Sequence, residues 1–113
     1  MGPKLRENKW MGSKVEEFLA KEMKNPAFRM AFSEARARRI KRALAEGLRQ
    51  LRQGRGLSQA ALAKRAKTTQ AVVSRIENPG VPYLPSVEVL ARLAVALGAH
   101  LEIALVPEIR TAA

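Results

Sequence analysis

The stretch Thr68–Asn78, which reads TTQAVVSRIEN, decides how the chain folds. Thr69 is typical of helix N-termini, because its hydroxyl oxygen can accept a free backbone N–H of the first turn. Val73 and Ile76 stand three residues apart and therefore share one face of the helix that follows. The other face consists of small or hydrogen-bonding residues: Gln70, Ala71, Ser74 and Arg75. Such side chains fit the DNA major groove, where glutamine pairs with adenine and arginine with guanine.

A second short helix is predicted directly before this stretch. Ser58 is its N-cap, and an apolar face follows at Leu62, Ala63 and Ala66, so the helix runs over residues 58–67. Two short helices joined by a turn at residues 67–69 form a helix-turn-helix, whose second helix enters the major groove while the first crosses the DNA backbone.

Further helices are predicted on both sides of this motif. An apolar stripe runs from Pro26 to about Arg52 as one long helix or as two helices with a break at residues 33–39, and Gly54 and Gly56 end it. Its inner positions in the second half are Ile40, Leu44, Leu48 and Leu51. Ser86 caps a last helix, which shares one apolar face at Val87, Leu90, Leu93, Ala94 and Leu97.

The segment Leu101–Val106 alternates as LEIALV and favours a short C-terminal β-strand. A lone strand leaves its backbone groups unpaired, so it needs a partner chain or another segment. The alternative is a coil that packs Leu101, Ile103 and Leu105 into the core.

Composition limits the function classes. A chain of 113 residues forms one domain with at most an appendage. It has no Cys, one His (His100) and no Asp, which excludes disulfides and thiolate or multi-histidine metal sites and leaves few groups for catalysis. We expect a non-enzymatic protein without cofactor or metal. The start lacks the apolar core of a signal peptide and no segment is long enough to span a membrane, so we expect a cytoplasmic protein.

The charge is concentrated in one part of the chain. Residues 36–75 hold 12 of the 21 Lys and Arg and one of the 10 acidic residues, so the whole excess of +11 lies there. A concentrated positive charge is typical of proteins that bind polyanions. For residues 36–42 we favour a solvated basic face that steers DNA at long range, with direct contact to DNA as the alternative.

The motif RGLSQAALAKRAKTTQAVVSRIEN (residues 55–78) resembles the helix-turn-helix of the XRE family, which includes the lambdoid repressors, and PSVEVLARLAVALG (residues 85–98) resembles the helices that follow it. The similarity covers about residues 40–97. The matching positions are Leu57, Ser58, Gln59, Leu62, Ala63, Val73, Ser74, Arg75, Ile76 and Glu77. The resemblance implies an all-α, lambda-repressor-like helix-turn-helix domain that binds double-stranded operator DNA as a homodimer.

The resemblance also implies roles for single residues. The candidate base contacts are Gln70, Ala71, Ser74 and Arg75. Gln59 would bind a phosphate or an outer base by the same resemblance. From the residues themselves we add Arg55, Ser58, Lys67 and Thr69 as candidate phosphate contacts, with a solvated charge as the alternative for Arg55. Arg52 and Glu77 are expected to form a structural ion pair that sets the angle of the second helix.

Two positions depart from the family pattern. Lys67 stands where the family usually has a glycine, and a lysine with positive φ is strained, which predicts a slightly different turn. Asn78-Pro79 stands where Asn-Gly is typical, so the contacts that the family makes from the following loop are not carried over.

The N-terminal part, with VEEFLAKEMKNPAFRMAF at residues 15–32, resembles HigA-type antitoxins, as does the ending LEIALVPE at residues 101–108. This resemblance implies a small mRNA-cleaving toxin of the RelE/HigB-like type as partner. The candidate toxin-binding residues are Phe18, Leu19, Met23, Phe28, Met30 and Phe32. The alternative is that these side chains complete the domain's own core.

The sequence therefore predicts four parts: a disordered tail (1–12), an N-terminal helical extension (13–39), the DNA-binding domain (40–98), and a C-terminal strand and tail (99–113). The function it predicts is an antitoxin that neutralises its toxin and represses its own operon. The alternatives are a repressor without a toxin partner and an adaptor that binds only proteins. A steep loss of DNA affinity with salt would argue against the adaptor.

Overall fold

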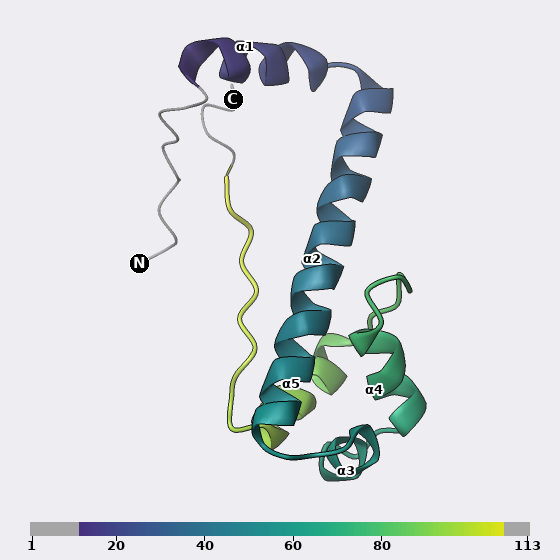
Figure 1. Cartoon of the computed structure of the whole chain (residues 1–113). Coiled ribbons are helices and arrows are strands. Elements are labelled where there is room, and N and C mark those ends of the chain that lie inside the picture. Colours follow the sequence, from purple (N-terminus) through teal and green to yellow (C-terminus); the bar gives the residue numbers. More distant parts are fainter. Residues whose placement is uncertain (1–11, 108–113) are drawn as a thin grey trace. The chain divides into compact units, whose positions relative to one another are not determined.

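The computed structural model of the chain describes residues 12–107, so residues 1–11 of the expected N-terminal tail (1–12) and residues 108–113 of the expected C-terminal strand and tail (99–113) lie outside this range (Figure 1). Within it the chain is all-α, as expected. Its helices are α1 (Gly12–Glu22), α2 (Pro26–Gly54), α3 (Gln59–Arg65), α4 (Gln70–Glu77) and α5 (Val87–Ala96). None of these helices combines the length and apolar character needed to cross a membrane.

The chain divides into two units, and the boundary falls inside α2. One unit contains the described residues up to Glu34 and those from Ile103 onward, and the other contains Ala35–Glu102. The second unit holds α3, α4, α5 and most of α2, so it contains the whole helix-turn-helix.

The segment from Pro26 to Gly54 is one continuous helix, which decides between the two alternatives that the sequence left open. Leu48 is buried as expected, but Ile40 is 62% exposed and Leu51 is 46% exposed. Lys41, at 5% exposure, takes the inner position instead of Ile40. The apolar stripe is therefore interrupted by a buried lysine, whose partners lie on α4 and in the loop after it.

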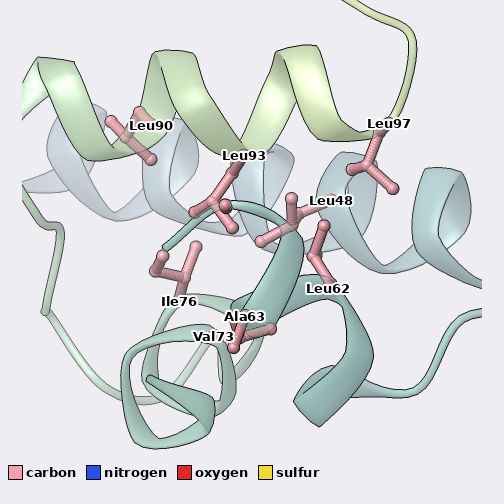
Figure 2. Packing of buried hydrophobic residues seen from close by; sticks show 9 residues of the cluster. Leu48, Leu62, Ala63, Val73, Ile76, Leu90, Leu93 and Leu97 are labelled. Atoms are coloured by element: carbon pink, nitrogen blue, oxygen red, sulfur yellow. The ribbon is translucent and has the colours of Figure 1, made fainter. Parts of the chain in front are cut away.

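The core of the second unit lies where α3, α4 and α5 surround the C-terminal half of α2 (Figures 1 and 2). Figure 2 shows leucines from α2, α3 and α5 and the apolar side of α4 meeting in one cluster. Its buried members are Leu48, Leu62, Ala63, Ala66, Val73, Ile76, Leu90, Leu93 and Leu97. Val87, which was expected on this face, is 61% exposed because it stands in the first turn of α5, at the edge of the cluster.

The predicted β-strand at Leu101–Val106 is wrong: residues 101–107 have no regular secondary structure. The physical reason is that no described segment pairs with their backbone, and an unpaired strand has no ladder of hydrogen bonds. The alternative holds only for Leu101, which packs against the core cluster. Ile103 is 68% exposed and Leu105 is fully exposed, so neither joins the core.

Candidate DNA interface

Short helices need caps, and both helices of the motif have one. The Ser58 hydroxyl accepts the backbone N–H of Ala61 at 3.0 Å at the start of α3, and the Thr69 hydroxyl accepts that of Val72 at 3.2 Å at the start of α4. Each cap satisfies a donor that the helix itself leaves free. Both oxygens keep their own hydrogen for a further bond. These two hydroxyls can therefore donate to a phosphate while they hold their helices.

The turn between α3 and α4 keeps the geometry that normally requires glycine. Lys67 adopts φ 55°. The prediction that a lysine at this position changes the shape of the turn is therefore wrong. The backbone N–H of Thr68 donates to the carbonyl of Ala63 at 2.9 Å and closes the end of α3 around this conformation. The packing of the two helices thus imposes the left-handed conformation on Lys67 in spite of its cost. The Lys67 side chain is exposed.

The two faces of α4 have opposite character. Val73, Ile76 and Glu77 are buried. The four candidate base contacts are all exposed: Gln70, Ala71, Ser74 and Arg75. The Arg75 guanidinium carbon lies 5.8 Å from the centre of the Tyr83 ring, a distance at which a cation is attracted to the ring face. Arg75 is therefore exposed but supported from one side by the loop after α4.

A buried ion pair fixes α4 against α2. Arg52 donates from Nε to Glu77 Oε2 at 2.7 Å and from Nη2 to Oε1 at 2.8 Å, while its Nη1 donates to the carbonyl of Leu57 at 2.7 Å. The side chains are only 11% and 4% exposed. The hydrogen bonds to Glu77 raise the pKa of Arg52 above its ordinary value, against the opposing effect of burial. This two-point geometry sets the orientation of α4 as well as its position.

Gln59 belongs to the same network. Its amide nitrogen donates to Glu77 Oε1 at 3.2 Å, and its side chain is half-buried. A glutamine amide has two N–H groups, so one remains for another acceptor. The structure thus links a candidate phosphate contact at the start of α3 to the carboxylate that anchors α4.

Lys41 is a residue of this site that the sequence did not indicate. Its Nζ donates to the carbonyl oxygens of Arg75 and Ile76 at 2.8 Å each and to that of Tyr83 at 2.9 Å. These carbonyls lie at the C-terminal end of α4, where the helix dipole favours a cation, and in the loop that follows. Burial lowers the pKa of the Lys41 ammonium from its ordinary value. A lysine within a run of arginines gives no signal of this role, because its spacing alone does not distinguish it from solvated neighbours.

Arg92 does for α3 what Lys41 does for α4. Its Nε donates to the carbonyl of Ala66 at 2.9 Å, at the C-terminal end of α3. The sequence did not indicate this role of Arg92 either. The C-terminal ends of both helices of the motif are therefore held by long cationic side chains from outside it.

Arg55, the remaining candidate phosphate contact, directly follows α2 in the chain, and its side chain lies near the end of α5. Its guanidinium group sits against the Cα of Gly98, where any Cβ would collide with it. Gly98 has φ 71°, a conformation that glycine adopts without strain. Arg55 is exposed.

The candidate toxin-binding residues lie in the other unit, on α1, on the first turns of α2 and between them. Phe18 is 56% exposed and Met30 is 62% exposed. Leu19, Met23, Phe28 and Phe32 are half-buried. The rings of Phe28 and Phe32 stack with their centres 5.9 Å apart. Arg29 Nη1 donates to the carbonyl of Met23 at 2.8 Å and so ties the start of α2 to the turn before it.

With the fold and the site described, the comparison with known families identifies the class. Residues 43–105 match the helix-turn-helix domain family. The chain belongs to this family, and the matched range contains α3, α4 and α5 and the candidate DNA contacts from Arg55 to Arg75. No curated protein and no solved structure matches the chain significantly. The family match alone thus identifies the class: this is a DNA-binding protein of the helix-turn-helix kind.

Proposed function

We propose that this protein is a transcriptional regulator that reads an operator as a homodimer, with α4 of each copy in the major groove. The observation that carries the proposal is the division of α4 into a buried side and an exposed side made of Gln70, Ala71, Ser74 and Arg75. Groups of this kind read base edges, and a surface helix that served only solubility would not need them.

The surrounding residues fit the second requirement of such a protein, which is attachment to the DNA backbone. Ser58, Gln59, Lys67 and Thr69 lie at the starts of α3 and α4 and in the turn between them, where backbone N–H groups and helix dipoles favour anions. Contacts of this kind set the register on the duplex and carry no sequence information. The excess charge of +11 adds a long-range attraction to the same polyanion.

A homodimer follows from how little one α4 can read. One helix covers a few base pairs, and two copies related by a two-fold axis read two half-sites about one helical turn apart. The test is selection of bound duplexes from a random library by the full-length protein. We expect enrichment of an inverted repeat with half-sites about 10 base pairs apart. No enriched sequence, or a single unrepeated half-site, would contradict the homodimeric operator reader.

We propose as a second layer that the N-terminal region binds a RelE/HigB-like toxin, so that the protein is the antitoxin of a pair and represses their operon. Phe18 and Met30 support this, because large apolar side chains exposed on neighbouring elements suit an adaptable protein interface. The resemblance of residues 15–32 to HigA-type antitoxins points to the same partner.

The test is co-expression of the tagged protein with the adjacent reading frames. We expect a small toxin to co-purify and its mRNA cleavage to be blocked. The matched variant Phe18→Asp/Met30→Asp should lose the toxin and still bind DNA. If no partner co-purifies with the unchanged chain and DNA binding is intact, the protein is a repressor without a toxin partner.

A further inference from the structure

Three arginines on α2 have no role in the site described above. Arg38, Arg42 and Arg49 are separated by four and seven residues, so they fall on one side of the helix and form a row, here called the arginine stripe. All three are exposed. Within residues 12–107 none of their side chains forms an ion pair or a hydrogen bond, although Glu46 lies on the same helix.

The neighbours of α2 show which side the stripe occupies. Lys41 and Arg52 lie on the side that contacts α4, through the carbonyls of its last turn and through Glu77. Leu44, Gly47 and Leu51 lie on the side that forms a groove with α5. At 100° per residue, the stripe lies next to the α4 side and is turned away from α5.

This placement puts the stripe beside the C-terminal end of α4. Lys41 holds that end at less than one helical turn from Arg38 and Arg42 along α2. The loop from Asn78 to Ser86 reads NPGVPYLPS and contains no Lys or Arg. The loop after α4 therefore supplies no cation for the DNA backbone there, while α2 supplies three.

We propose that the arginine stripe binds phosphates of the same duplex that α4 reads, beyond the C-terminal end of that helix. The proposal rests on the proposed DNA-binding function and extends the interface from the helix-turn-helix to α2. Arg38 to Arg49 spans about 17 Å of helix. One DNA strand presents a phosphate about every 3.4 Å along its axis, so a straight row of cations meets several of them. Guanidinium groups suit phosphate oxygens, because their planar donors bind in pairs.

The sequence favoured a solvated face at residues 36–42 and left direct DNA contact as the alternative; the stripe takes up that alternative for Arg38 and Arg42 and extends it to Arg49. A face that only steers DNA acts from a distance, whereas a contact surface releases counterions from the phosphates that it covers. Counterion release has a direct measure, because the slope of log affinity against log salt changes by about 0.9 for each phosphate contact. Steering without contact changes the association rate and leaves this equilibrium slope nearly as it was.

The test compares two full-length variants that remove the same charge. Arg38→Gln/Arg42→Gln removes two residues of the stripe, and Lys21→Gln/Lys24→Gln removes two exposed cations of α1 and the turn after it. Equilibrium binding to the selected operator and to a random duplex is measured from 50 to 200 mM salt. We expect the stripe variant to lower the salt slope by about 2 on both duplexes, and the matched variant to leave it unchanged.

Each other outcome has a definite meaning. An unchanged slope for the stripe variant, or an equal fall for both variants, overturns the proposal, because the arginines then act through net charge or not at all. If the stripe variant loses a protein partner and keeps its slope, the surface binds an acidic protein and the proposal is wrong. If the unchanged protein binds neither duplex, the proposed function itself fails, and this result is distinct from the others.

Discussion

The two ends of α4 are held in different ways. At the C-terminal end, Lys41 binds two carbonyls of the last turn, and Arg52 binds the Glu77 carboxylate at two points. At the N-terminal end the ties are local: the Thr69 cap and the turn that contains Lys67. One end is anchored by long-range side-chain bonds to α2, while the other end is left exposed.

This difference shows how a short helix can be held rigidly and still be accessible to a ligand. Eight residues are too few for a stable helix in isolation, so the position of α4 depends on what it packs against. Anchoring from behind and at one end leaves the other end open to a ligand. Substitutions at the anchored end should therefore lower the free energy of unfolding, and substitutions at the open end should mainly change DNA binding.

The largest effect is expected from Arg52→Leu. The variant leaves the Glu77 carboxylate, 4% exposed, with only the Gln59 amide at 3.2 Å as a partner. Removing one member of a buried ion pair costs about 3–5 kcal/mol, because the other charge stays buried. Urea denaturation of both proteins measures the difference.

The double variant Arg52→Leu/Glu77→Leu is the control for this prediction. It removes the uncompensated charge, so it should recover a large part of the lost free energy of unfolding. If the double variant is no more stable than Arg52→Leu, packing explains the loss and the ion pair does not.

Lys41→Met should be next in size. The side chain is of similar length, but three carbonyl oxygens lose their donor, which costs about 3 kcal/mol if they stay shielded from water. Ile40→Met changes the adjacent, 62% exposed residue and should alter stability by less than about 0.5 kcal/mol. Equal denaturation midpoints for the two variants would show that Lys41 does not anchor α4.

On the exposed side of α4, Gln70→Ala at the open end and Arg75→Ala in the last turn should change the base preference of the protein and change its stability much less than the two substitutions above, because both remove only exposed side-chain atoms. Each variant should lose about 1–3 kcal/mol of discrimination at one operator position, because one side chain pairs with one base edge. Binding to a panel of single-base operator variants, measured beside a random duplex, gives this value. An equal loss on every duplex would show that the residue contacts only the backbone.

The smallest effect is expected from Lys67→Gly, and it should have opposite signs in two assays. Glycine adopts the observed φ of 55° without steric cost, but it also gives the unfolded chain more freedom, so we expect a gain of about 0.5–1 kcal/mol in unfolding free energy. DNA affinity should fall equally on all duplexes, with a salt slope lower by about 1. An unchanged slope would remove Lys67 from the phosphate contacts.

Local patterns in the sequence were enough to predict the helix-turn-helix. The caps at Ser58 and Thr69 and the buried positions Val73 and Ile76 depend on neighbours within one or two turns, and these neighbours are visible in the sequence. The contact between Arg52 and Glu77 joins residues 25 positions apart, and it was expected because of the family resemblance.

What the sequence did not predict depends on distant partners. Lys41 is buried because the fold places carbonyls of α4 and of the loop at Tyr83 around its ammonium group. The spacing of residues in the sequence does not predict contacts over this separation. The prediction of a strand at residues 101–106 was wrong because a partner is missing: alternating apolar residues form a strand only where another strand pairs with their backbone. The DNA-contact and toxin-contact assignments stay predictions until a ligand is tested.

The buried ammonium of Lys41 also offers a way to measure local unfolding at the end of α4. An amine-reactive reagent would meet a nitrogen whose three hydrogens are all engaged and whose side chain is only 5% exposed. Exposed lysines such as Lys64 would be labelled at once. The rate at which Lys41 becomes labelled would therefore measure how often the end of α4 detaches from α2 while the rest of the domain stays folded.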